Sequence, residues 1–504
     1  MLKIDKNEEF LRSVNSTNFF PYGPVSFVIL GAWDTRRGPL LKNLWYVQKS
    51  KTDLQENSIE LNIQEIENNK YCNDYVEPTK FIVNYILGAL LNGGDEPCHC
   101  DDSYTTSYSN QKADKIDADN LIKFKYILSE KHQMIVHSFL FNAPNQDEKF
   151  ISPFCLSFIF PIKLKDKCLV WQPMISNFMN QNIPYLRIIH RKSDQDGLIT
   201  DYTVVITYLI GVLRSLDQFS VSNTICLRKT YFSTSSYEKI RREFLSTAIM
   251  SHLITFGRSL VIGTDVNLIN TMIRTLAIFL PLDKRELCVE LIEKEHFNFS
   301  SDIMVQGLCK DNIFDVDYTF WSVVSGSYPL TVINLNNMRV LQSGNYTYHK
   351  WMQHLMHEAL LKKLFLLEKC QPIKLYLKNI HINLDYILKD GCYLGDLCKT
   401  FVTKIMNASG CRRKLEIFNI FMELMNAKAK LLVTLAKQLL RKDPNHRNWK
   451  FLRNQIQDVC QLKCDGDFLI VLAFAEQLCP GIYCTVLECP SEKISDLATM
   501  FNHL

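Results

Sequence analysis

A glycine turn between a short apolar run and a helical run is the candidate in this sequence for binding the phosphates of a nucleotide. Ser259 to Gly263 predict a buried strand, and Thr264 and Asp265 follow as helix caps. A strand, a glycine turn and a helix can hold phosphates, but a Walker loop needs a second glycine with Lys and Ser/Thr, and a dinucleotide fingerprint needs three glycines. Asp265 would also repel a phosphate from the positive end of the helix dipole. We therefore expect a capped helix and no nucleotide site.

Two groups of side chains have the residue types that bind metal ions. His354 and His357 lie on a predicted helix and precede Glu358, but the order H-x-x-H-E differs from the zincin H-E-x-x-H. Five late cysteines have spacings that match no zinc motif, namely Cys460, Cys464, Cys479, Cys484 and Cys489. Surface histidines and buried thiols are the simpler interpretation, and a metal-dependent hydrolase is kept as an alternative of a different class. No cofactor is expected.

Two arginines are predicted at the tip of a β-hairpin. Arg36 and Arg37 lie within Asp34-Thr-Arg-Arg-Gly-Pro39, between two β-rich runs. Exposed guanidinium groups suit an acidic or phosphate-bearing partner, and a GTPase-activating finger is one such arginine supplied in trans. A solvated turn is the simpler interpretation. Both are therefore candidate partner or GTPase contacts, and no residue is assigned a catalytic role.

A basic stretch lies in the last fifth of the chain. Residues 428 to 453 hold eight Lys or Arg against one Asp, a net charge of +7. The basic residues are Lys428, Lys430, Lys437, Arg441, Lys442, Arg447, Lys450 and Arg453. A surface for anionic lipid or for an acidic partner is one interpretation, and the solvated face of a packed helix is the simpler one.

Composition limits the class of protein. The 504 residues carry 57 Lys and Arg against 53 Asp and Glu, a net charge of +4, which is too balanced for a chain whose main partner is nucleic acid. No apolar run is long enough for a membrane span, and the polar start lacks the apolar core of a signal peptide. Seventeen scattered cysteines indicate reduced thiols. These features predict a cytoplasmic, multidomain protein.

The elements that must position these residues fall into three parts. After a polar tail over 1–18, residues 19–215 predict an antiparallel sheet with helices against it; the strand runs are 25–33, 40–47, 123–128, 133–141 and 154–162, and the helical runs 81–91, 170–191 and 201–219. An acidic segment over 93–120, with a net charge of −5, is predicted to be a mobile insertion loop. Residues 216–242 are polar and form the best linker candidate.

The remainder changes from mixed to helical. Residues 243–385 predict an α/β part: a helix ending at Gly257, the strand and capped helix described above, a further helix over 283–295, and strands around 303–309 and 330–335. Residues 386–504 predict a mainly helical part. Amphipathic runs lie at 350–368, 394–406, 414–440 and 467–478. The predicted fold class is therefore α+β, multidomain.

Three segments together resemble one known family. AWDTRRGPLLKNLW in the first hairpin, SHLITFGRSLVIGTDVNLINTMIRTLAIFL with MVQGLCKD in the middle, and LRNQIQDVCQLKCDGDFLIVLAFAEQLCPG near the end resemble the longin/DENN protein family of the chromosome 9 amyotrophic lateral sclerosis and frontotemporal dementia locus. The segments occur in the family's order, and the likeness extends from Phe19 to Glu488. The acidic segment over 93–120 is an insertion relative to the family pattern.

The resemblance implies a fold and a function. It implies an N-terminal longin domain, followed by a DENN module with an α/β part and a helical part. It also implies a non-membrane-spanning regulator of Rab or Arf small GTPases in endosomal, lysosomal and autophagic traffic, recruited from the cytoplasm to endosomes or lysosomes. Family members pair with a second, larger DENN protein and a WD-repeat protein, so a non-catalytic subunit of a GTPase-activating complex is expected. A Rab guanine nucleotide exchange factor is the nearest alternative.

Overall fold

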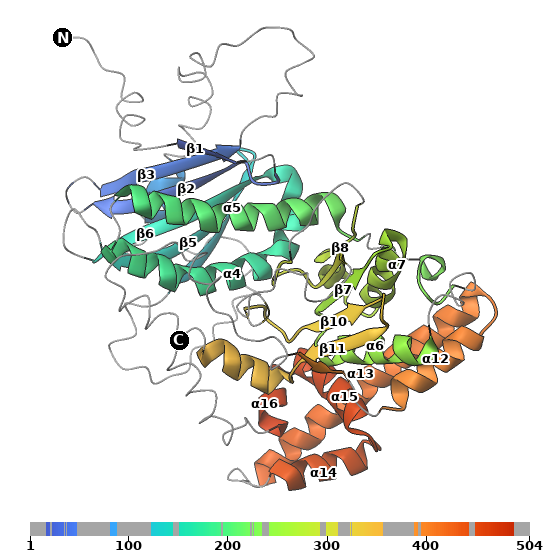
Figure 1. The fold of residues 1–504 in the computed structure, drawn as a ribbon. Coiled ribbons are helices and arrows are strands. Elements are labelled where there is room, and N and C mark those ends of the chain that lie inside the picture. Colours follow the sequence, from blue (N-terminus) through green and yellow to red (C-terminus); the bar gives the residue numbers. More distant parts are fainter. Residues whose placement is uncertain are drawn as a thin grey trace, which may run out of the picture. The chain divides into compact units, whose positions relative to one another are not determined.

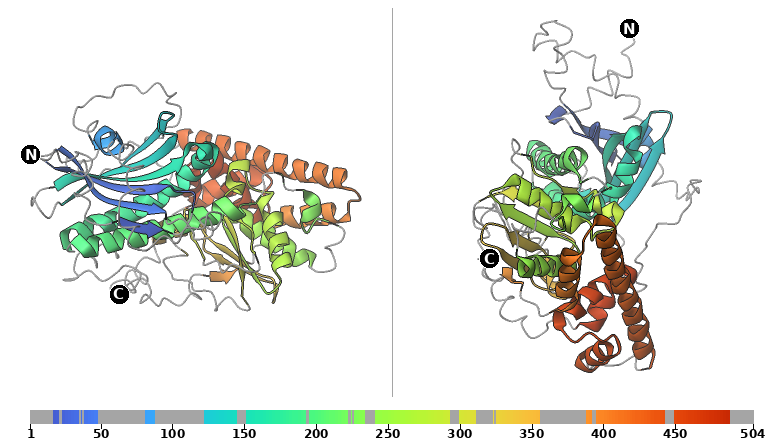
Figure 2. Two further views of the ribbon diagram at one scale, coloured as in Figure 1. Left: turned by 90° about the horizontal axis from the view of Figure 1, so that it is seen from above. Right: turned by 90° about the vertical axis from the view of Figure 1, so that its right-hand side faces the viewer.

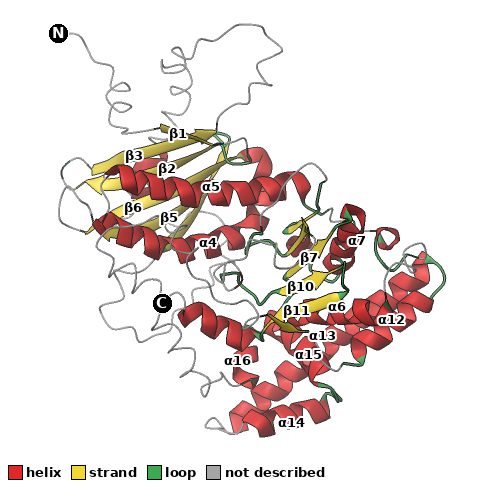
Figure 3. Ribbon diagram, in the orientation of Figure 1, coloured by secondary structure: helices red, strands yellow, loops and turns green. Residues whose placement is uncertain are grey.

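The computed structural model describes most of the chain as two compact units, one up to Asp217 and one from Gln218 onward. The described residues are 17–20, 23–34, 36, 38–47, 81–87, 122–144, 151–192, 195–221, 224, 226–233, 241–292, 299–310, 323, 325–355, 388–391, 395–442 and 449–487. The predicted insertion loop over 93–120 lies outside them. Figure 1 traces both units, and Figure 3 shows that sheets and helices occur in each of them. The predicted mixed α and β composition is therefore confirmed.

The first unit is built on a six-stranded sheet in the order β1-β3-β2-β6-β5-β4. Its strands are β1 (Thr17–Phe20), β2 (Phe27–Asp34), β3 (Gly38–Val47), β4 (Lys123–Ser129), β5 (Met134–Pro144) and β6 (Ile151–Pro161). All neighbours are antiparallel except β1, which runs parallel to β3. Strand β1 begins at Thr17, inside the segment predicted to be a polar tail.

Helices cover both faces of this sheet because its strands bury side chains on both sides. Residues 81–87 form a short helix whose Ile82, Val83 and Ile86 join the core cluster with Ile29 and Val136. Helices α4 (Lys165–Lys192) and α5 (Gln195–Phe219) lie on the other side of the sheet (Figure 2). The first unit is a three-layer sandwich of helix, sheet and helix pair.

Helix α5 is long and apolar enough, over Gly197–Phe219, to cross a membrane by length and composition alone. Its contacts are those of a core helix. Tyr202 is fully buried and meets His190 of α4 at 2.9 Å, and Thr203 accepts a hydrogen bond of 2.9 Å from the indole of Trp45 on β3. An apolar helix that packs on a sheet beside a second helix can have the length and composition of a membrane span.

The second unit contains a mixed sheet in the order β12-β11-β10-β7-β9-β8. Its strands are β7 (Ser259–Gly263), β8 (Cys288–Val289), β9 (Val305–Cys309), β10 (Thr331–Asn334), β11 (Arg339–Ser343) and β12 (Leu388–Asp390). Strands β8, β9, β7 and β10 are parallel, and β11 and β12 are antiparallel to their neighbours. The predicted strand over Ser259–Gly263 is found at those bounds.

Two helices pack on the same face of this sheet. Helix α6 (Arg242–Ile254) faces β10 through Ser251, whose hydroxyl lies 2.8 Å from that of Thr331. Helix α7 (Val266–Ala277) faces β7 and β9 through Ile269, which lies so close to Gly307 that a Cβ there would clash at 2.5 Å. Between the two helices and the sheet runs one apolar core that includes Val261.

The C-terminal helices share that core. They are α12 (Leu397–Asn407), α13 (Cys411–Lys442), α14 (Trp449–Val459), α15 (Asp465–Leu478) and α16 (Ile482–Val486). Helix α15 is nearly all buried because its apolar side chains surround it, and it packs on both α13 and α6. The predicted α/β part and the predicted helical part therefore lie in one compact unit and share one core.

Two expectations from the sequence are corrected by local packing. The predicted helix over 283–295 is wrong: within its described residues, up to 292, the helix α8 (Leu282–Arg285) ends at Arg285, and Cys288 and Val289 then pair with β9 as β8. The Arg285 guanidinium donates to the backbone carbonyls of Ala277, Ile278 and Leu280, which fixes the turn between α7 and α8. Within the predicted linker over 216–242, Tyr231 and Phe232 are buried in the core, and the short helix η4 (Leu227–Lys229) precedes them.

Candidate functional site

The N-terminus of α7 is closed by its own cap. The Asp265 carboxylate accepts hydrogen bonds from the backbone N–H groups of Asn267 (2.8 Å) and Leu268 (3.2 Å). These are the groups that would otherwise hold a phosphate, and the carboxylate adds a negative charge in the same place. The prediction of a capped helix at Asp265 is confirmed.

The carboxyl ends of the central strands are joined by one amide. The Asn336 Oδ1 atom accepts hydrogen bonds of 3.2 Å from both the backbone N–H and the hydroxyl of Thr264. Its Nδ2 atom donates to the carbonyl oxygen of Lys310 at 3.4 Å. Ligands of α/β sheets bind beside the carboxyl ends of the strands. Here Asn336 links the ends of β7, β9 and β10 to one another.

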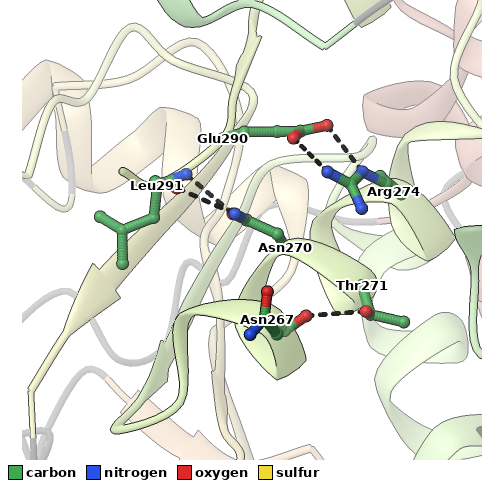
Figure 4. A network of polar contacts seen from close by, with 6 residues as sticks. All are labelled: Asn267, Asn270, Thr271, Arg274, Glu290 and Leu291. Atoms are coloured by element: carbon green, nitrogen blue, oxygen red, sulfur yellow. Dashed lines mark hydrogen bonds and ion pairs between the residues drawn. The ribbon is translucent and has the colours of Figure 1, made fainter. Parts of the chain in front are cut away.

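The exposed side of α7 carries a network of polar contacts (Figure 4). Asn270 donates to the carbonyl oxygen of Leu291 and accepts from its N–H, both at 2.8 Å. Arg274 lies one turn further and forms a two-bond ion pair with Glu290, with Nε to Oε1 at 2.8 Å. Hydrogen bonding to Glu290 raises the pKa of the Arg274 guanidinium. Two side chains of one helix therefore hold the segment that follows β8.

A cavity of about 360 Å³ lies beside this network. It is lined by Gln218, Phe219, Ser220, Val221, Thr224, Lys229, Arg274, Glu290, Leu291 and Ile292. Two cations and one carboxylate meet there, but the carboxylate is engaged by Arg274. No nucleophile with an adjacent base lies among these lining residues, so the cavity lacks the groups that acid–base or nucleophilic catalysis needs.

A Ser–His pair elsewhere in this unit has the distance of a catalytic dyad without access to solvent. The Nδ1 atom of His252 on α6 lies 2.8 Å from the hydroxyl of Ser259 on β7. His252 is fully buried and Ser259 is 2% exposed. Burial lowers the pKa of His252 to about 3, so the ring stays neutral. The pair joins helix to strand, and no substrate can reach it.

The residues considered as metal ligands do not form a cluster where the structure describes them. His354 is exposed on a helix over residues 346–355, while His357 and Glu358 lie outside the described residues. Cys460 is buried, Cys464 lies 3.9 Å from the Asp396 carboxylate, and Cys489 lies outside the described residues. Within the described ranges, no three His, Cys, Asp or Glu side chains come together in a way that could hold a metal ion.

The hairpin arginine Arg36 lies in the turn between β2 and β3 and is exposed, whereas Arg37 lies outside the described residues. The Arg36 backbone N–H donates to the Asp34 carboxylate at 2.8 Å, which fixes the turn. Gly38 follows with a φ of 81°, a conformation that favours glycine. The turn places Arg36 in solvent, where a partner can reach it.

The basic stretch is divided by the structure. Lys428 donates to the carbonyl oxygen of Cys460 at 2.6 Å, and Arg453 pairs with Asp465 at 2.6 Å while lying over the Phe468 ring. Lys430, Lys437 and Arg441 are exposed on α13, whereas Arg447 lies outside the described residues, as do the side chains of Lys442 and Lys450. Among the described basic residues, Lys428 and Arg453 are therefore engaged in contacts within the unit, whereas Lys430, Lys437 and Arg441 are exposed.

Comparison with known proteins gives the family. The C9orf72-like protein family matches residues 104–349. A human protein named guanine nucleotide exchange factor C9orf72 is 24% identical over 494 residues, which is 93% of this chain and 92% of that protein. Over residues 104–349 the chain resembles the C9orf72-like family. The mouse and rat homologues match this chain with the same identity and coverage.

The family resemblance predicted from the sequence is therefore confirmed. The matched range includes Asp265, the Asn270 network and the Arg274–Glu290 pair. It begins after the Arg36 hairpin and ends before α13. Sequence reasoning did not identify the pairing of Arg274 with Glu290, because residues 283–295 were expected to be helical. The one available signal was a polar row on α7, formed by Asn267, Asn270, Thr271 and Arg274.

Proposed function

We propose that this chain regulates a small GTPase through protein–protein contacts and contributes guanine nucleotide exchange activity. The observation that supports the proposal is the match, over 93% of the chain, to relatives named guanine nucleotide exchange factors. An exchange factor needs no reactive side chain of its own, because it acts by stabilising the nucleotide-free GTPase. The closed N-terminus of α7 agrees with this role, since it provides no phosphate cradle in the regulator itself.

A second candidate is a non-catalytic subunit of a GTPase-activating complex. The observation that favours it is the exposed Arg36, which a GTPase or a partner chain could contact. Its hairpin precedes the residues that match the family model. In this proposal a second, larger DENN protein and a WD-repeat protein complete the complex, and the longin and DENN domains implied by the resemblance form the contacts. Both candidates act on Rab or Arf GTPases and place the chain in the cytoplasm with recruitment to endosomes or lysosomes.

The two candidates are separated by the reaction that is accelerated. Purified full-length chain is added to a panel of Rab and Arf GTPases loaded with fluorescent GDP, and nucleotide release is followed in the presence of excess unlabelled GTP. Acceleration by the chain alone supports exchange. Acceleration of single-turnover GTP hydrolysis, seen only when the partner proteins are added, supports the activating complex. A panel in which neither rate changes would overturn both.

A further inference from the structure

Helix α13 carries an apolar row that is separate from the face it buries. The buried side packs on the core through Phe421, Met425, Ala429, Leu432 and Ala436. The second row is exposed and consists of Ile420, Leu424, Ala427 and Leu431. Ile420 is 63% exposed, and Leu424 and Leu431 are each 41% exposed. Spacings of four, three and four residues are those of the seam in a coiled coil, so α13 has the surface of a helix that pairs with another helix.

The row is continuous with the core at its edge. Ile417 and Leu435 are half-buried and pack against the core cluster. Figure 2 shows α13 as the long orange helix at the border of the second unit, with one side turned away from the other elements of that unit. The exposed apolar row therefore adjoins the buried face of α13, a helix of 32 residues. Contiguous surfaces of this kind mark interaction sites.

Charges along one side of the row follow the seven-residue repeat. Glu416, Glu423, Lys430 and Lys437 are all exposed, and the first two are acidic while the last two are basic. Glu416 also forms an exposed pair with Arg412 at 3.3 Å, a type of contact that contributes little stability. Positions beside a helix seam set the choice and orientation of the partner. The order acid, acid, base, base is complementary to itself when it is reversed.

We propose that α13 pairs antiparallel with α13 of a second copy of this chain. A twofold axis near residues 425 and 426 places Ile420 opposite the second copy's Leu431, and Leu424 opposite its Ala427. The same axis brings the charged sides of the two helices together. Glu423 then lies about 3 Å along the helix axis from the second copy's Lys430, because each residue advances the helix by about 1.5 Å. Glu416 and Lys437 are related in the same way.

Other occupants fit this surface less well. An anionic membrane would attract Lys430 and Lys437 but would repel Glu416 and Glu423, which lie beside the same row. In a parallel helix pair, the charged side of one α13 would face the side of the second α13 that lies across the apolar row from its own charges. On that side Phe421 is buried and Lys428 is already bonded to Cys460, so the charges would find no matching row. Only the antiparallel arrangement satisfies both the apolar row and the charges.

Charge reversal tests the pairing in the full-length chain. Sedimentation equilibrium between about 1 and 100 µM measures the dissociation constant of the dimer. Glu423→Lys places two lysines together at each of two symmetric contacts, and Lys430→Glu does the same with two glutamates. Each single variant should weaken the dimer at least about tenfold. The double variant carries the reversed pattern, which is again self-complementary, and should dimerise like the unchanged chain.

Mixing the two single variants provides the sharpest result. A chain with lysine at both positions and a chain with glutamate at both positions are complementary, so their equimolar mixture should form heterodimers more tightly than either variant forms homodimers. Leu424→Gln should abolish dimers, whereas Leu415→Gln is the matched control, because Leu415 is 49% exposed on the opposite side of α13. Circular dichroism confirms that each variant is folded.

Three outcomes would overturn the proposal. The first is a chain that stays monomeric at about 100 µM, including one that binds only anionic vesicles or a different protein through this row. The second is a dimer that the charge reversals do not weaken. The third is a mixture of the single variants that forms no heterodimer.

Discussion

The carboxylate of Asp467, in the first turn of α15, accepts hydrogen bonds from the backbone N–H groups of Asp396 and Leu397, both at 3.1 Å, where α12 begins. One side chain thus supports the start of a helix about seventy residues away in the sequence. Burial raises the pKa of Asp467, and the two N–H groups oppose that rise. Gly395 leaves room for the contact, since a Cβ there would lie 2.9 Å from an Asp467 oxygen.

We expect Asp467→Ala to lower the free energy of unfolding by about 2 kcal/mol, because it leaves two N–H groups of α12 without their acceptor. Asp465→Ala is the control, as Asp465 lies in the same first turn of α15, but its side chain is 68% exposed and its surface ion pair with Arg453 contributes little stability. Urea unfolding followed by circular dichroism measures both. Equal losses for the two variants would show that the contact with α12 does not matter.

Elements with strong local patterns were predictable, and elements fixed by distant contacts were not. Strand β7 and the Asp265 cap follow from an apolar run and a capping residue that are adjacent in the sequence. The segment after α8 was expected to be helical, but Asn270 and the pairing of Cys288 with Val305 override that preference. Sequence periodicity contains no information about such contacts.

The candidate site shows the same limit. Arg36 could be placed at a hairpin tip because Asp34, Gly38 and Pro39 are turn formers. The eight basic residues over 428–453 were considered as one surface, but Lys428 and Arg453 are bonded within the unit. Charge counts along a sequence do not reveal which side chains a neighbouring helix engages. The apolar row on α13 was also hidden, because Leu431 and Leu432 look alike in sequence while one is exposed and the other buried.

His137 predicts a pH dependence of stability in the first unit. It is fully buried on β5 among the rings of Phe124, Tyr126 and Phe160, and its ring nitrogens have no hydrogen-bond partner in the described structure. Burial lowers its pKa to about 4. A histidine whose pKa is lower in the folded state binds more protons when unfolded, so stability is fully present above about pH 6.5 and falls as the pH drops toward 4.

We therefore expect His137→Phe to reduce the loss of stability between pH 7.5 and pH 5 by about 1 to 2 kcal/mol. Hydrogen exchange of the β5 amides at the two pH values reports the opening of this unit. His190→Phe serves as the comparison: burial lowers the pKa of His190 to about 3, but this substitution also removes its bond to Tyr202 and should cost stability at both pH values. An unchanged pH slope in His137→Phe would contradict the assignment.

Arg274 and Glu290 should be coupled in stability. Their side chains are 28% and 26% exposed, so solvent screens the pair only in part. A double-mutant cycle of Arg274→Ala and Glu290→Ala should give a coupling free energy of about 1 kcal/mol at low salt, and less at 1 M salt. Arg339 and Asp390 form the control pair, because both are 55% exposed and should couple more weakly. Equal coupling in the two cycles would show that partial burial adds nothing.

The last prediction concerns the hairpin arginines and the direction of GTPase regulation. If the chain positions a GTPase and another protein supplies the charge-stabilising arginine, Arg36→Ala combined with Arg37→Ala should leave single-turnover GTP hydrolysis by the assembled complex within a few-fold of the unchanged complex. A true arginine finger contributes about 10³ to 10⁵ in rate, so the two outcomes differ by orders of magnitude. Saturating concentrations of the complex are required so that weakened docking is not mistaken for lost chemistry.

Lys42→Ala on β3 is the control for a change of charge on the same hairpin. A thousand-fold loss would place the finger in this chain, where Arg36 is exposed in the turn. Exchange accelerated by this chain alone, and unaffected by the arginine substitutions, would instead separate the hairpin from the activity altogether.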